Sequence, residues 1–121
     1  PLAYAIKNNS VEMINLLIEN KAKINDTFLD KTSLLMYCVM LEKNSLINVI
    51  IENGINIDLQ DSLGRTALMI AVEKENLDAI KKILFHKPDI KATDFSGNSI
   101  FDHSKYVRDR KVKELINSLN F

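Results

Sequence analysis

The sequence predicts an all-α solenoid of four stacked helix-turn-helix pairs, with short β-hairpin-like fingers between successive pairs. Three observations predict this fold: an ungapped period of 33 residues, apolar positions at helical spacing within the period, and two glycines one period apart. The 121 residues suit one unit that is large enough to bury a core. We expect a single domain over 1–121, with repeats at about 1–27, 28–60, 61–93 and 94–121.

The period is visible in columns of similar residues that an offset of 33 positions brings into register. One column is apolar and is expected in the core: Leu17, Ile50, Ile83 and Ile116. A second column holds small residues: Ala5, Cys38, Ala71 and Ser104. Columns this alike in size and polarity do not arise from composition alone, so each period is expected to be one structural unit.

The third period shows how each unit is expected to fold. The hydroxyl of Thr66 can cap a short first helix over residues 67–72. Asn76 can cap a second helix, whose apolar positions follow i, i+3, i+4 spacing: Ala79, Ile80, Ile83 and Leu84. The second helix ends at Lys87 and Pro88, because proline has no amide with which to continue it.

The same pattern extends to both ends of the chain. Residues 88–98 predict a short finger, and Ser99 restarts the pattern as the next cap. A last helix over about 109–119 is rich in charge, which predicts a polar C-terminal cap. Because Pro1 enters in the middle of a unit, the first repeat is truncated, and we expect the native protein to continue upstream.

Neither helix of a pair is expected to be stable alone, because helix nucleation is unfavourable and a helix of roughly ten residues has too few hydrogen bonds to offset it. Burial against the neighbouring repeat must supply the stability, so the repeats have to stack side by side. The column of small residues would let the first helices approach one another closely.

Two segments carry a resemblance to a known family. Residues 61–71 resemble the ankyrin-repeat signature D-x-x-G-x-T-P-L-H-x-A, which residues 94–104 repeat more weakly. Residues 50–58 are similar to the family's L-L-x-x-G-A-D-V-N. With the period, these motifs make essentially the whole chain resemble ankyrin-repeat proteins. The resemblance implies a non-catalytic module that binds another protein.

The chain departs from the family pattern at three kinds of position. The second repeat has Phe28 where an Asp is usual and Lys31 where a Gly is usual, which predicts an irregular finger. Lys21 and Lys87 replace the glycine that ends a second helix, which predicts altered turns at both positions. The signature histidine is absent, which predicts that the usual Thr–His bracing is missing; its positions hold Ala3, Met36, Met69 and Asp102.

The side chains that could carry chemistry have structural interpretations. Cys38 falls in the small column, so we interpret it as a buried structural thiol, and His103 falls in an apolar column, which indicates packing. Glu73 and Glu75 are expected to be solvated on different helix faces. Nothing resembles a metal-ligand spacing, a phosphate loop or a catalytic motif. The sequence therefore predicts no enzyme, no cofactor and no metal site.

Composition limits the partners and the setting. Sixteen basic and sixteen acidic side chains cancel, which disfavours nucleic acid, and the apolar runs are too short to span a membrane. A single cysteine favours a reducing, cytoplasmic setting, with secretion as an effector as an open alternative. We expect a monomer, unless the truncated N-terminal face associates. A basic cluster is interpreted as a solubilising cap, with nucleic-acid or acidic-lipid binding as the alternative: Lys105, Arg108, Arg110, Lys111 and Lys113.

The resemblance implies that a partner protein contacts the finger tips and the inner face of the first helices. At those positions the chain has apolar residues, which we expect to form the centre of the site: Phe28, Leu29, Met40, Leu41, Leu63 and Phe95. Polar residues are expected around them: Arg65, Glu73, Lys74 and Asn98. Two alternatives stay open. The apolar residues could instead cover the irregular finger or an upstream repeat, and the whole module could be the regulatory or targeting region of a larger enzyme or effector.

Overall fold

The computed structural model describes residues 7–8, 11–19 and 24–119, without the side chains of Met13 and Leu17. The first helix of the pair is α3 (Leu34–Met40) in repeat 2, α5 (Ala67–Glu73) in repeat 3 and α7 (Ile100–Ser104) in repeat 4. The second helices are α2 (Val11–Glu19), α4 (Ile47–Glu52), α6 (Leu77–Phe85) and α8 (Arg110–Asn117). Two short 3-10 helices, η1 (Leu29–Lys31) and η2 (Asn44–Leu46), complete the described elements.

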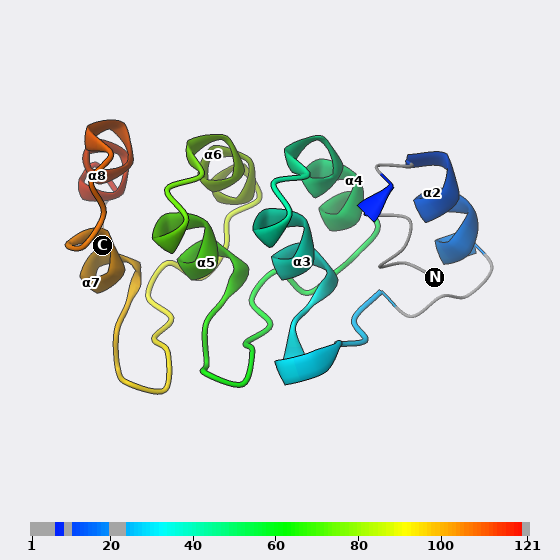
Figure 1. Ribbon diagram of the computed structural model, residues 1–121, viewed down its shortest axis with the longest axis horizontal. Helices are drawn as coiled ribbons and strands as arrows, with labels where there is room; N and C mark the ends of the chain where they lie inside the picture. The colour runs from blue at the N-terminus through cyan, green and yellow to red at the C-terminus, as the bar shows by residue number, and fades with distance from the viewer. Residues whose placement is uncertain (1–6, 9–10, 20–23, 120–121) are drawn as a thin grey trace.

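The helices form two layers, and the fingers extend from one of them (Figure 1). The first helices α3, α5 and α7 pack side by side, and the second helices α4 and α6 pack on each other above them. The fingers project from the first helices on the side away from the second helices. This arrangement is the predicted solenoid of stacked helix pairs.

The core lies between the two layers and between successive repeats. Ile50, Ile83 and Ile116 have no exposed surface, which confirms the predicted apolar column for these positions. The small column is also buried at Cys38, Ala71 and Ser104. Ala5 and the side chain of Leu17, which complete these columns in the first repeat, lie outside the described residues.

The described first helices α3, α5 and α7 begin with side-chain caps, as predicted for Thr66 and Ser99. The hydroxyl groups of Ser33 and Thr66 accept hydrogen bonds from the backbone amides of Met36 and Met69, at 3.1 and 3.3 Å. The reciprocal bond replaces the missing Thr–His bracing, because each methionine Sδ accepts from the amide of its cap residue, at 3.3 and 3.5 Å. In repeat 4 the amide of Ser99 donates instead to a carboxylate oxygen, Asp102 Oδ2, at 2.9 Å.

The second helices differ in how they begin. Asn76 caps α6 and Asp109 caps α8 through their side chains, since both can accept from backbone amides. In repeat 2 the position equivalent to Asn76 and Asp109 is Lys43, whose side chain has no hydrogen-bond acceptor. The chain there passes through the 3-10 turn η2 before α4 begins, without a side-chain cap.

The fingers are closed by turn hydrogen bonds, and no strand occurs in the part of the chain that the structure describes. The amide of Asp61 donates to the carbonyl of Arg65, and the amide of Asp94 donates to that of Asn98, both at 2.9 Å. The finger of repeat 2 is irregular, as predicted: it contains η1, with Asp30 and Lys31 in the left-handed region at φ 59° and 57°.

The turn after α6 corrects one expectation. Lys87 has φ 55°, and its backbone amide donates to the carbonyl of Leu84. One repeat earlier, Gly54 has φ 93° and its amide makes the equivalent hydrogen bond to the carbonyl of Ile51. The lysine therefore keeps the glycine-type turn, and the predicted alteration was wrong. Lys21, for which the same alteration was predicted, lies outside the described residues.

Candidate protein-binding face

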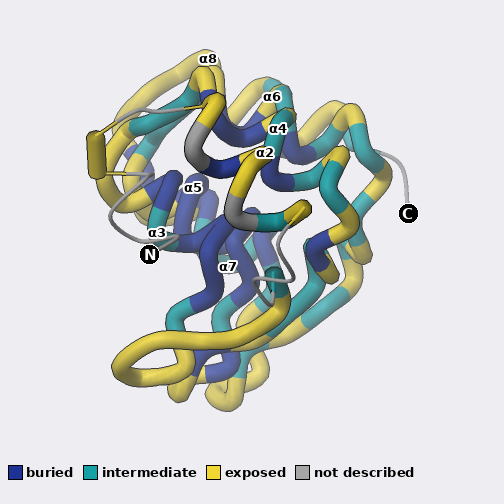
Figure 2. Tube along the Cα trace, turned by 90° about the vertical axis from the view of Figure 1, so that its right-hand side faces the viewer, coloured by how far each residue is buried: buried dark blue, intermediate teal, exposed yellow. Residues whose placement is uncertain are grey.

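The predicted apolar centre is exposed where it lies on the fingers. Leu29, Leu63 and Phe95 occupy three successive tips and are 86%, 60% and 72% exposed. Figure 2 shows these tips as exposed loops below the buried first helices. Met40 ends α3 and Leu41 caps it, and both are about two-fifths exposed, at 42% and 38%. We call the surface of the ten predicted residues the binding face.

The three tips are joined into one continuous edge. The amide of Ser62 donates to the carbonyl of Asp30 at 2.9 Å, and the amide of Phe95 donates to that of Leu63 at 3.0 Å. Phe95 also covers Gly64, where an added Cβ would lie 2.5 Å from the ring. Because each tip is bonded to the next, the exposed apolar side chains are carried on a connected backbone.

Phe28 contacts the helix that follows its finger. Its ring centroid lies 5.9 Å from that of Tyr37 on α3, and the side chain is 39% exposed, much as Met40 and Leu41 are. For this residue the structure agrees with the alternative interpretation, in which it covers the irregular finger. Leu29 beside it makes no such cover, since it is almost fully exposed.

The apolar residues of repeat 2 have charged or ionisable counterparts at equivalent positions of repeats 3 and 4. Phe28 aligns with Asp94 and Tyr37 aligns with His103, so an aromatic contact in repeat 2 becomes an ion pair in repeat 4. Met40 likewise aligns with Glu73. Beside the apolar tips, the binding face therefore changes at these three columns from apolar residues in repeat 2 to charged residues in repeats 3 and 4.

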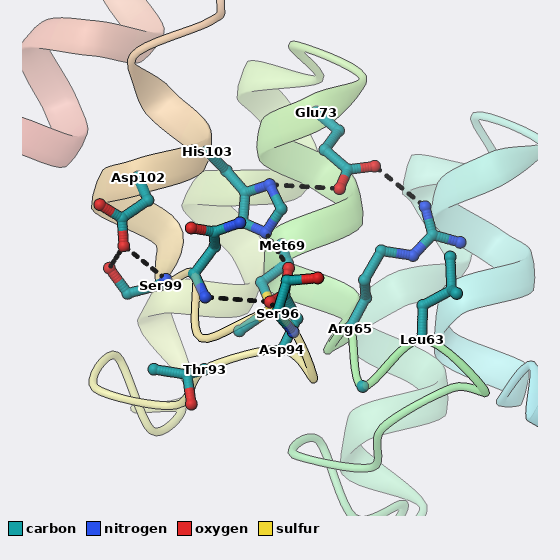
Figure 3. Close-up of polar contacts among 12 residues, drawn as sticks. Leu63, Arg65, Met69, Glu73, Thr93, Asp94, Ser96, Ser99, Asp102 and His103 are labelled. Carbon is teal, nitrogen blue, oxygen red and sulfur yellow. Dashed lines mark hydrogen bonds and ion pairs between the residues drawn. The ribbon is translucent and has the colours of Figure 1, made fainter.

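A chain of ionic contacts crosses repeats 3 and 4 (Figure 3). Asp61 is buried, and its Oδ2 lies 2.9 Å from both Nε and Nη2 of Arg65. Arg65 Nη1 lies 3.0 Å from Glu73 Oε2, and the other Glu73 oxygen lies 3.3 Å from His103 Nδ1. His103 Nε2 lies 3.0 Å from Asp94 Oδ2. Glu73 thus links its own repeat to the next one.

Within this series of ionic contacts, neighbouring groups shift the pKa values of Asp94 and Arg65. Burial opposes the charge of Asp94, but hydrogen bonds from the amides of Asn98 and Ser96 and from His103 lower the pKa of its carboxyl. Burial also opposes the charge of Arg65, yet its hydrogen bonds and charge interactions with Asp61 and Glu73 raise its pKa. Both groups therefore favour their ionised forms.

These contacts correct three expectations from the sequence. His103 does not serve as apolar packing, because both ring nitrogens face carboxylates. Glu73 is paired rather than simply solvated. Glu75 is also engaged, since its Oε1 accepts from the amides of Arg108 and Asp109 at 2.6 and 2.5 Å. One sequence feature could have predicted the Asp94–His103 pair. The two residues are nine positions apart, as are Phe28 and Tyr37 in the same columns of repeat 2.

The remaining predicted residues lie at the border of the face. Lys74 caps α5 and is exposed. Asn98 is also exposed, and its backbone N–H donates to the carboxylate of Asp94. Among the described residues, no cluster of histidine, cysteine and carboxylate side chains is placed to hold a metal ion. Cys38 is buried, which raises the pKa of its thiol to about 12.

Comparison with known proteins identifies the family of the fold. A family model described as ankyrin repeats in three copies matches residues 2–94. The chain belongs to the ankyrin-repeat family. Ankyrin repeats are generally protein–protein interaction modules. No helix in the described part of this ankyrin-repeat chain has the length and apolar character that crossing a membrane requires.

Similar ankyrin-repeat proteins occur in viruses, bacteria and mammals. Ankyrin repeat protein FPV022 of fowlpox virus is 36% identical over 83 residues, covering 69% of this chain and 14% of that protein. An ankyrin repeat protein of Rickettsia felis is 30% identical over 84 residues, covering 69% and 28%. Ankyrin repeat domain-containing protein 63 of Mus musculus is 37% identical over 57 residues, covering 47% and 15%. The chain thus spans less than a third of each relative.

Proposed function

We propose that this chain is a non-catalytic module that binds a partner protein across the binding face. The observation that carries the proposal is the row of exposed apolar side chains on joined finger tips: Leu29, Leu63 and Phe95. Exposed apolar surface costs about 25 cal/mol per Å² relative to buried surface, so covering this row stabilises a complex.

The charged half of the face would give such a complex its orientation. Arg65, Glu73 and His103 are already held by one another, so a partner meets charges whose positions are set before binding. An apolar centre with a charged border is the usual arrangement of protein interfaces. Cys38 is free and buried, which supports a cytoplasmic setting as part of the same proposal.

The experiment compares two surface variants of the tagged protein in quantitative pull-downs from native lysate. Met40→Ser with Leu41→Ser alters the binding face, and Phe85→Ser is the control because Phe85 is 80% exposed on α6, in the other layer. We expect partners to be lost from the first variant and retained by the second.

Circular dichroism of both variants separates binding from folding. Partners that stay bound to a folded Met40→Ser, Leu41→Ser variant would show that the proposed centre is wrong. Unfolding of that variant would instead support the packing interpretation of these two residues. In that case Leu29→Ser with Leu63→Ser repeats the binding test at the exposed tips.

The alternative function, as the regulatory or targeting region of a larger enzyme or effector, concerns the whole protein. Its support is that the relatives are several times longer than their matched segments. Mass spectrometry of the intact native gene product tests it, because a catalytic segment in the same polypeptide would favour this alternative.

A further inference from the structure

The end of the stack beyond α7 and α8 carries charged residues at positions that are apolar between repeats. Val72 and Ile80 have no exposed surface. Val39 and Ile47, which hold the same columns one period earlier, have none either. In repeat 4 these two columns hold Lys105 and Lys113, and both are exposed. Another ankyrin repeat stacked here would bury two ammonium groups, which is costly without partners.

The same end also has an apolar floor. Phe101 aligns with Leu68, which is 2% exposed, but Phe101 itself is only half-buried. Phe101 lines two hollows. One of about 330 Å³ is lined by Ile90, Lys91, Ser99 and Phe101. The other, of about 350 Å³, is lined by Phe101, Ser104, Lys105, Lys113 and Asn117. We call the two hollows together the end groove.

The border of the end groove is basic. Lys91 lines one hollow, and Lys105 and Lys113 line the other. The carboxylate that the structure places against this border is Asp102, 3.4 Å from Lys105 Nζ. Asp102 is already engaged, because it accepts a hydrogen bond from the amide of Ser99 at 2.9 Å. The groove therefore presents an excess of positive charge around an aromatic side chain.

We propose that the end groove binds an acidic peptide segment of a partner protein, with one bulky apolar side chain of the peptide seated beside Phe101. Carboxylates on either side of that side chain would meet Lys91 across one hollow and Lys105 and Lys113 across the other. A recessed aromatic floor suits a single inserted side chain better than a flat lipid surface, which favours protruding apolar groups. This site is separate from the binding face and does not depend on it.

The test selects phage-displayed random peptides on the wild-type protein, after depletion on a Lys105→Glu, Lys113→Glu variant. Both lysines are exposed, so the variant is expected to fold, which circular dichroism checks. We expect the surviving peptides to be rich in aspartate and glutamate around one aromatic or aliphatic residue. By fluorescence anisotropy, they should bind the depleting variant more weakly by on the order of tenfold or more.

Two controls connect the result to this groove. Lys81→Glu with Lys87→Glu reverses the same number of exposed charges, one on α6 and one in the turn after it, and these changes should leave peptide binding unchanged. The Met40→Ser, Leu41→Ser variant should also bind the peptides as wild type does, even if the binding face proposal fails. Loss of the apolar residue from a selected peptide should weaken its binding to the wild-type protein.

Several outcomes would overturn the proposal. Surviving peptides without acidic residues, or equal binding to the wild-type and Lys105→Glu, Lys113→Glu proteins, would contradict the role of the basic border. Binding to phosphatidylserine vesicles but to no peptide would assign the groove to a lipid surface. A dimer in analytical ultracentrifugation that dissociates on the same substitution would assign it to a second copy of the chain.

Discussion

Residues in equivalent positions of this chain stabilise their fingers by different chemistry. Phe28 and Tyr37 make an aromatic contact, whereas Asp94 and His103 in the same two columns make an ion pair. Both pairs connect a finger to the first helix that follows it. Substituting one member alone would leave either a charge without its partner or an unfilled space.

Asp94 predicts a pH dependence of stability. Its carboxyl has a lowered pKa in the folded protein, so it stabilises the fold above the usual aspartate range, near pH 4, and that contribution is lost as pH falls. The Asp94→Asn variant should therefore be less stable than wild type at pH 7, and the difference should shrink at pH 3. Urea unfolding at the two pH values measures this. An equal difference at both would show that the charge contributes nothing.

Cys38 predicts a chemical property of the native state. Because burial raises the pKa of its thiol to about 12, almost no thiolate exists at pH 8, and the folded core excludes reagents. We expect no reaction with a thiol-specific chromogenic disulfide in buffer and one equivalent of reaction in guanidinium chloride. Rapid labelling of the folded protein would show that the small column is not closed.

At the scale of the elements, caps decide where helices begin. The sequence predicted the caps at Thr66, Asn76 and Ser99, because hydroxyl and amide oxygens at the start of an apolar run have one common use. It did not predict that methionine sulfur would take the reciprocal role of the missing histidine. Sulfur is a weak acceptor, and only the folded structure brings it within reach of the amide.

Lys43 predicts a stabilising substitution. It has nearly the backbone angles of Asn76, the residue one period later that caps α6, with φ −86° against −87° and ψ 59° against 84°. Lys43→Asn should supply the missing cap and raise the free energy of unfolding by about 1 kcal/mol. Thermal denaturation measures the gain, with Lys81→Asn inside α6 as the control that should lose stability slightly. No gain from Lys43→Asn would mean that η2 does not result from the missing cap.

Two glycines test the contact between fingers. Gly64 and Gly97 have nearly the same positive φ, 80° and 82°, but an added Cβ meets Phe95 at 2.5 Å only at Gly64. Gly97→Ala should cost about 1–2 kcal/mol for its backbone conformation alone. Gly64→Ala should cost about 1–3 kcal/mol more, because Phe95 must move. Denaturant unfolding compares them, and equal costs would show that the fingers are not in contact there.

At the scale of the whole molecule, the fold could be predicted from the sequence because it repeats. Each column is sampled several times, so Ile50, Ile83 and Ile116 support the same inference independently. The site was predictable only in part. Exposure of Leu29 and Leu63 follows from their place on the tips, but the links among Arg65, Glu73 and His103 join side chains of different repeats, which a column comparison does not pair.

The solenoid also explains why the residues beside the apolar tips differ between repeats. Stacking buries the columns that face neighbouring repeats, so their residues must stay apolar or small, while columns on the open side are free to vary. That freedom allows repeat 2 to present Leu29 and Met40 and repeat 3 to present Arg65 and Glu73 on one surface. A partner with an apolar segment beside a charged one would match both.

Amide hydrogen exchange of the chain with and without a captured partner tests this account most directly. We predict slower exchange in the partner complex at the finger tips and the ends of α3 and α5, with second helices α4 and α6 unchanged. Protection confined to α4 and α6, with the tips exchanging as in the free protein, would contradict the assignment of the binding face.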